Sequence, residues 1–280
     1  MINSLVNIFM NQKIPLILGA LLIIIVVFAA LNFTSVAPDV TVPVDTETTQ
    51  DESSSTMLEV KTESVAYFPE AVGFYAEPQT PGNYPGVVMI HENRGLRDEI
   101  KQAAEELAAE GYRVLAVDLY KGNVLETQEE ARAYSSQFNQ EEGLANMQAA
   151  VAYLETKGAE KIASLGWCFG GRQSVELAIS GVPLDATVVY YGGGMATSTE
   201  RLAPIGWPVL GVFGDQDQVI PVSMVTDFET SLDALGVENE IYMYEDVGHA
   251  FANPSNPNFA PEPTADAWAK TLSFLERHLQ

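Results

Sequence analysis

The chain has 280 residues, 47% of them hydrophobic and 19% charged, which suits one globular domain with an appended segment. It carries 38 acidic and 14 basic residues, for a formal net charge of −24. Nucleic acids and anionic membrane surfaces are therefore not expected as partners, because both are bound through cationic protein surfaces.

The first distinct feature is an almost wholly apolar run at residues 14–33. About 20 such residues span a bilayer as a helix, whereas the apolar part of a signal peptide is usually shorter. We therefore favour a transmembrane anchor, with a cleaved signal peptide as the alternative because residues 35–37 resemble a cleavage site. Lys13 precedes the run and acidic residues follow it. The positive-inside rule thus predicts residues 1–13 in the cytoplasm and the rest in the periplasm or outside the cell, secreted if the segment is cleaved.

A change of composition marks the next segment. Residues 34–57 are rich in Thr, Ser, Pro, Asp and Glu and show no apolar periodicity, which predicts a disordered acidic linker. Residues 58–280 are the expected catalytic domain.

Strand and helix patterns alternate along this domain. Alternating runs at 58–60, 65–68 and 71–76 are typical of antiparallel edge strands, and buried strands are expected at 86–90, 112–117, 161–165, 186–191, 208–213 and 240–244. Helices are expected at 99–110, 126–138, 142–156, 172–179, 222–235 and 265–279. The order predicts the α/β class, with a mostly parallel sheet flanked by helices. Functional groups are then expected at the carboxyl ends of the strands.

The central motif is GWCFGG at residues 166–171, between an apolar strand and a helix. The pattern G-x-C-x-G-G in this context is typical of the nucleophile elbow of an α/β-hydrolase, with Cys168 in place of serine. Gly166 and Gly170 would let the strand and helix approach closely around a strained nucleophile. Cys168 is the only cysteine, so neither an intrachain disulfide nor a thiol cluster for a metal is expected, and no cofactor is predicted. The alternative is a small buried cysteine in a glycine turn.

Three histidines are candidates for the general base. His278 lies in the last turn of the final helix, a usual place for an exposed cation, and His91 ends a strand, where it would serve as polar packing. His249 follows the last strand, and α/β-hydrolases have the chain order nucleophile, acid, histidine, so His249 is the expected base. Either Asp215 or Asp217 could be the acid. We favour Asp217 because it lies deeper in its loop, which leaves Asp215 as a turn residue.

From about residue 58 to residue 280, the chain resembles the dienelactone hydrolase family. The matching segments are 91–95 (HENRG), 118–120 (DLY), 166–171, 190–192 (YYG), 217–221 and 248–252 (GHAFA). The resemblance implies an α/β-hydrolase fold and a triad of Cys168, Asp217 and His249. It also implies that Glu92 helps to control the ionisation of the cysteine before substrate arrives. Without the resemblance, Glu92 would be better explained as a surface loop acid.

These parts predict hydrolysis of a carboxylic ester or lactone through a thioester. His249, oriented by Asp217, would take or hold the thiol proton. Backbone N–H groups of Phe169 and Asn93 would stabilise the oxyanion. Two alternatives remain. One is a catalytically silent hydrolase fold that binds ligands outside the membrane. The other is a redox thiol protein, which the absence of a resolving cysteine disfavours.

Four residues are candidates for substrate binding: Arg94, Arg132, Asn253 and, from the matched segment 118–120, Tyr120. Family members that act on the acidic dienelactone hold its carboxylate with an arginine four residues after the histidine, where this chain has Asn253. Arg94 and Arg132 are the candidates to compensate. From the missing arginine and the acidic composition, we expect neutral esters or lactones to be preferred over anionic ones.

Overall fold

The computed structural model describes residues 57–280. The predicted anchor at 14–33, and all of the predicted linker except residue 57, fall outside the described residues. Within 57–280, no helix combines the length and the apolar character needed to cross a bilayer.

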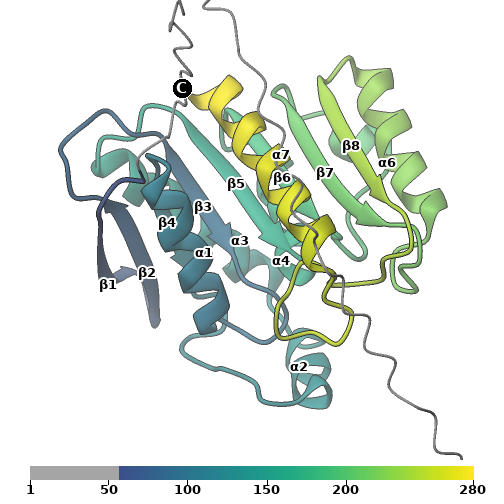
Figure 1. Cartoon of the computed structure of the whole chain (residues 1–280), viewed down its shortest axis with the longest axis horizontal. Helices are drawn as coiled ribbons and strands as arrows, with labels where there is room; N and C mark the ends of the chain where they lie inside the picture. Colours follow the sequence, from purple (N-terminus) through teal and green to yellow (C-terminus); the bar gives the residue numbers. More distant parts are fainter. Residues whose placement is uncertain (1–56) are drawn as a thin grey trace, which may run out of the picture. The chain divides into compact units, whose positions relative to one another are not determined.

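Eight strands form one sheet in the order β1-β2-β4-β3-β5-β6-β7-β8 (Figure 1). The first two strands are antiparallel to each other, and β2 is antiparallel to β4, while every other neighbouring pair is parallel. The strands are β1 (Val60–Phe68), β2 (Ala71–Pro78), β3 (Gly86–Ile90), β4 (Arg113–Val117), β5 (Ile162–Trp167), β6 (Ala186–Tyr190), β7 (Val209–Gly214) and β8 (Asn239–Tyr244).

Burial explains why the central strands are continuously apolar. Every residue of β3, β5, β6 and β7 is buried, because helices cover both faces of the parallel sheet. The edge strand β1 instead exposes most of its residues. The predicted mostly parallel α/β sheet with antiparallel edge strands is therefore confirmed.

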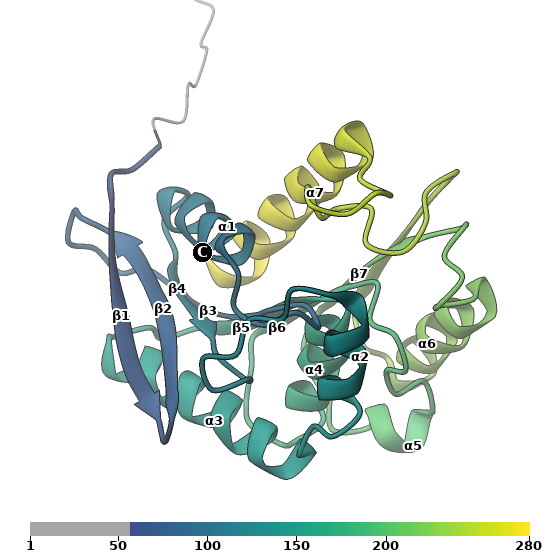
Figure 2. The ribbon, with the colours of Figure 1, turned by 90° about the horizontal axis from the view of Figure 1, so that it is seen from below.

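Helices lie on both faces of the sheet (Figure 2). On one face are α1 (Asp98–Ala109) and α7 (Pro261–Leu279), and on the other are α3 (Gln140–Thr156), α4 (Phe169–Ala178), α5 (Thr199–Leu202) and α6 (Val222–Leu235). The short helix α2 (Gln128–Ser135) lies near the carboxyl ends of the central strands (Figure 1).

Differences from the sequence-based expectation are local. Helix α2 is shorter than the predicted 126–138 because Thr127 and Glu130 form a capping box that fixes its start. Helix α7 begins at Pro261 rather than at 265, since proline is well suited to the first position of a helix. The single turn α5 was not expected, because four residues carry too little periodicity to be recognised.

Candidate active site

The turn between β5 and α4 holds Cys168 in a strained backbone conformation, with φ 54° and ψ −113°. Positive φ is unfavourable for a residue with a Cβ, so surrounding structure must enforce it. A Cβ on Gly166 would collide with the backbone of Gly170, and one on Gly170 would collide with the carbonyl of Ile90. The glycines are therefore needed for the close strand–helix approach, as predicted. Helix α4 begins at Phe169, so its positive dipole end lies next to the sulfur.

Two loops bring the predicted partners to Cys168. His249 follows β8, and its Nε2 lies 3.1 Å from the Cys168 Sγ. Its Nδ1 lies 2.8 Å from Oδ2 of Asp217, which follows β7. The Asp217 side chain is only 1% exposed and the His249 side chain 20%. The three groups form one continuous chain of hydrogen bonds from acid to thiol.

The structure separates the two candidate aspartates by their contacts. Besides contacting His249, Asp217 accepts hydrogen bonds at Oδ1 from the backbone N–H groups of Val219 and Ile220, at 2.7 and 3.0 Å. These bonds orient its carboxylate toward the imidazole. Asp215 instead accepts the N–H of Asp246 at 2.8 Å, which ties the loop after β7 to the turn after β8. Asp215 is thus the turn residue, as expected when Asp217 was favoured as the acid.

The other two histidines have structural contacts. His91 is fully buried, its Nδ1 lies 2.6 Å from the carbonyl oxygen of Glu92, and its Nε2 accepts the N–H of Leu119 at 3.2 Å. Burial lowers the pKa of His91, which keeps the ring neutral. His278 is half-buried and packs on Phe274 within α7, so the expected exposed cation is instead a packed ring.

The environment of His249 favours its charged form. Burial opposes the charge, but the hydrogen bonds to Asp217 and Cys168 and their negative charges outweigh it and raise the pKa of His249. An imidazolium beside the sulfur in turn stabilises a thiolate. His249 is thus placed to supply the positive charge that a thiolate nucleophile at Cys168 would need.

Glu92 lies in the loop after β3, but its carboxylate bonds to residues other than Cys168. Asn253 Nδ2 donates to Oε2, and the Tyr191 hydroxyl donates to Oε1 at 3.4 Å. Burial raises the pKa of Glu92 to about 7, although the hydrogen bond from Asn253 and the nearby His249 partly oppose the rise. Half-protonation near neutral pH is unusual for a glutamate and marks a group whose charge is finely balanced.

A cavity of about 500 Å³ opens onto Cys168 and His249. Within the described chain its lining contains two arginines, Arg132 and Arg172, and no aspartate or glutamate. Neither guanidinium has a carboxylate within 4.0 Å among the residues from 57 to 280. The lining residues are Asn93, Arg132, Ser135, Ser136, Phe138, Gln140, Cys168, Phe169, Arg172, Gln173, Gly193, Val219 and His249.

The candidate substrate residues therefore divide. Arg132 lines the cavity, as do Asn93 and Phe169, whose backbone N–H groups are the expected oxyanion donors. Arg94 does not, because its guanidinium donates to the carbonyl oxygens of Leu125 and Glu126.

Tyr120 and Asn253 lie outside this cavity too. Tyr120 is fully buried, and its ring packs on Phe169 at a centroid distance of 5.4 Å, which supports the cavity wall from behind. Asn253 is engaged with Glu92. Sequence reasoning missed Arg172. The signal was its position four residues after Cys168 on a helix, which places both on one face, and the Arg172 N–H does donate to the Cys168 carbonyl oxygen at 3.2 Å.

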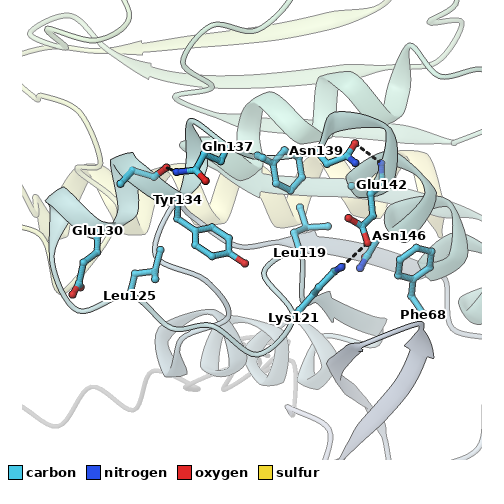
Figure 3. Close-up of a pocket in the computed structure, with 13 residues that line it drawn as sticks. Phe68, Leu119, Lys121, Leu125, Glu130, Tyr134, Gln137, Asn139, Glu142 and Asn146 are labelled. Carbon is cyan, nitrogen blue, oxygen red and sulfur yellow. Dashed lines mark hydrogen bonds and ion pairs between the residues drawn. The ribbon is translucent and has the colours of Figure 1, made fainter.

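A larger cavity of about 600 Å³ lies on the other side of α2 and contains no nucleophile (Figure 3). Its lysine, Lys121, is already paired with Glu142 at 2.7 Å and with Glu70 at 3.0 Å. Volume alone would favour this cavity, but the reactive groups lie in the smaller one.

Comparison with known proteins agrees with the fold. A family model described as the dienelactone hydrolase family matches residues 72–279. A protein of Saccharolobus solfataricus assigned as a carboxymethylenebutenolidase is 29% identical over 243 residues, covering 73% of this chain and 93% of its own. Another with the same assignment, from Synechocystis, is also 29% identical, over 75% of this chain and 93% of its own. A solved structure assigned as a dienelactone hydrolase, from Klebsiella pneumoniae, matches with a TM-score of 0.72 and 22% identity, over 78% of this chain and 99% of its own. The chain belongs to the dienelactone hydrolase family.

Proposed function

We propose that the protein hydrolyses carboxylic esters or lactones with Cys168 as the nucleophile, His249 as acid and base, and Asp217 as the group that orients the imidazole. The observation that carries the proposal is the hydrogen-bonded chain, with 3.1 Å from sulfur to Nε2 and 2.8 Å from Nδ1 to the carboxylate, at an elbow with positive φ. Nucleophile, base and orienting acid within hydrogen-bond reach are the signature of covalent catalysis.

Acylation begins from the thiolate–imidazolium pair. The Cys168 sulfur attacks the ester carbonyl carbon, and the carbonyl oxygen takes the negative charge. The N–H groups of Phe169 and Asn93 are the donors that we assign to this oxyanion. The carbon–oxygen bond of the ester then breaks, and the His249 imidazolium gives its proton to the departing alkoxide. For a lactone, the alcohol remains attached to the acyl group.

Deacylation reverses the roles. His249, now neutral, takes a proton from a water molecule that attacks the thioester carbon. The second oxyanion collapses and the carbon–sulfur bond breaks, which releases the carboxylic acid and the Cys168 thiolate. His249 keeps the proton that it took from water, so the ion pair is restored. Asp217 keeps Nδ1 protonated and facing its carboxylate.

We further propose that the substrate carries an anionic group, contrary to the expectation from Asn253 and the acidic composition. Two observations support this. Asn253 is bonded to Glu92 and does not line the cavity of Cys168, so the missing arginine does not remove a cation from that cavity. Arg132 and Arg172 do line it and have no carboxylate partner of their own there. A guanidinium at the mouth of a pocket suits carboxylate recognition.

The test of the mechanism is to trap its covalent intermediate. Full-length protein in a non-ionic detergent is mixed with a nitrophenyl ester, quenched in acid and weighed by mass spectrometry. The expected result is a mass increase of one acyl group on Cys168, with a burst of nitrophenol of one equivalent per chain. Iodoacetamide should inactivate the protein by alkylating the same residue. Turnover without any adduct on Cys168 would point to a different nucleophile, whereas the absence of both turnover and adduct would point to the silent binding module.

The N-terminal segment carries a separate proposal, that residues 14–33 anchor the catalytic domain to the membrane, outside the cytoplasm. The apolar run, with Lys13 before it and acids after it, supports this orientation. Protease added to intact cells, or to spheroplasts if an outer membrane is present, should cut the linker and release an active domain. A linker that resists protease until the membrane is opened would reverse the orientation, and a mature chain that starts near residue 38 would show cleavage instead.

A further inference from the structure

A third cavity, of about 310 Å³, is lined by residues of α1 and α7. These two helices lie on the face of the sheet opposite to α4 (Figure 2). Cys168 and His249 do not line it. Its lining residues are Glu92, Glu99, Ile100, Gln102, Ala103, Glu106, Trp167, Tyr190, Tyr191, Ala252, Asn253, Pro254, Pro261, Thr264, Ala265 and Trp268. The volume is at the low end for ligand pockets, so a small ligand is indicated.

The charge of this cavity is wholly negative. Glu92, Glu99 and Glu106 line it, and no lysine, arginine or histidine does within the described part of the chain. Glu99 already has a cation partner, because Arg97 Nε lies 3.0 Å from its carboxylate. Glu92 and Glu106 receive hydrogen bonds only from neutral groups, the latter from Gln102 at 3.1 Å. Neither carboxylate is therefore ion-paired with a lysine or arginine of the described residues, and the positive charge that acts on Glu92 is that of His249, which lies outside this cavity.

Four aromatic side chains also line the cavity. Trp167 and Tyr190 lie 5.6 Å apart at the ends of β5 and β6, and Tyr191 follows them. Trp268, on α7, completes the set. Aromatic rings attract cations through their negative faces, most strongly in tryptophan, and they also accept the apolar substituents of an organic cation. A metal ion of the hard class would instead need several oxygen ligands in close array.

We propose that the cavity between α1 and α7 binds a small organic cation, a quaternary or primary ammonium with short apolar substituents. Its charge would be balanced by Glu92 and Glu106, and its substituents would pack on Trp167, Trp268 and Tyr191. The site is separate from the cavity of Cys168. The two are linked by Glu92, which lines this site and was also predicted to take part in catalysis. A neutral apolar molecule would leave the partly buried carboxylate of Glu92 without a cation in contact with it, which disfavours such a ligand.

Tryptophan fluorescence gives a direct assay on the full-length protein in a non-ionic detergent. Of the three tryptophans, Trp167 and Trp268 line the cavity, while Trp207 does not and supplies a constant background. The probe is choline, and its control is dimethylbutanol, the neutral molecule in which carbon replaces the charged nitrogen. We expect saturable quenching by choline at one site per chain, and affinity for dimethylbutanol at least about tenfold lower. Equal affinity for the two, or no saturable quenching, would overturn the proposal.

Matched variants localise the effect. Glu106 and Glu105 are adjacent exposed residues of α1, but only Glu106 lines the cavity. Glu106→Gln should weaken choline binding about two- to fivefold, since an exposed charge contributes modestly, while Glu105→Gln should leave it unchanged. Ala103→Phe, which fills the cavity from α1, should abolish saturable quenching. Equal losses of affinity in both glutamate variants would mean that choline responds only to the acidic surface. Choline binding that survives Ala103→Phe would mean that the binding site lies outside this cavity.

Discussion

Two cavities beside the central strands carry opposite charge. The cavity of Cys168, on the α4 face, is lined by two arginines and no acid, whereas the cavity between α1 and α7 is lined by three glutamates and no base. Both statements hold for the described residues, in a chain whose formal net charge is −24. Average charge therefore does not predict the charge of a binding surface, because a few unpaired groups in a confined space dominate the local field.

The group shared between the two regions is Glu92. It lines the α1–α7 cavity, and its carboxylate is also close enough to His249 for the charge of the imidazole to affect its pKa. Asn253 and Tyr191 hold it in place by hydrogen bonds. A neutral amide at position 253 leaves this carboxylate without a cation, which an arginine at the same position would have supplied. Glu92 and its two partners are therefore one physical link between the two regions.

The largest expected effect is that of a variant that loses ester hydrolysis but keeps ligand binding in the α1–α7 cavity. Cys168→Ala should lower kcat/KM for an ester by at least about a thousandfold, because the covalent route is lost. The same variant should bind choline as the wild type does, since Cys168 does not line the α1–α7 cavity. Ester hydrolysis followed by absorbance and quenching followed by fluorescence measure the two properties on one sample. Wild-type turnover in this variant would exclude Cys168 as the nucleophile.

Much of the fold and the site was accessible from sequence because it rests on local patterns. The strand at 86–90 and the helix at 222–235 were predicted to the residue, since continuous burial and clear helical periodicity mark them. Cys168, Asp217 and His249 follow strands whose carboxyl ends meet at one edge, so their proximity followed from topology.

What escaped prediction depends on where side chains point. Position 253 was compared with an arginine that binds substrate, but Asn253 bonds to Glu92 and lines the other cavity. Arg94 adjoins Glu92 in sequence, yet its side chain is held by the backbone at Leu125 and Glu126. Sequence spacing fixes the face of an element on which a residue lies, whereas the partner that a long side chain selects depends on tertiary neighbours.

A second prediction tests the shared residue through stability. Burial raises the pKa of Glu92 from its ordinary value of 4.5 to about 7. Between these values the folded protein binds more protons than the unfolded chain, so this group's contribution to stability falls as pH rises from 4.5 to about 7. Glu92→Gln removes that cost. The variant should match the wild type near pH 4 and exceed its unfolding free energy above pH 8 by at most about 3 kcal/mol.

Urea unfolding at several pH values measures this difference. Glu105→Gln, on the exposed face of α1, is the control and should show no such pH dependence. Equal stability of Glu92→Gln and wild type across the whole range would mean that Glu92 keeps an ordinary pKa. The carboxylate would then be well solvated, which would also weaken the case for a confined negative cavity beside it.

The smallest expected effect concerns substrate charge, where the structure and the sequence-based expectation point in opposite directions. Arg172→Ala should lower kcat/KM for an anionic ester about three- to tenfold and change that for its neutral counterpart little, because an exposed guanidinium contributes modestly. Arg172→Lys should retain part of the preference, since the charge remains but the planar fork of donors is lost. Arg277→Ala, which removes an exposed arginine from the end of α7, is the control for net charge.

Salt adds an independent measure of the same contact. The wild-type preference for the anionic ester should shrink as ionic strength rises, because exposed charges are screened within about 10 Å at 0.1 M salt. The preference of Arg172→Ala for the anionic ester, and the dependence of that preference on salt, should both be smaller than in the wild type. A wild type that prefers the neutral ester at low salt would mean that the acidic field of the whole chain outweighs the two local arginines. The long-range electrostatic field of the whole chain, and not the local charge of the cavity, would then determine which substrate is preferred.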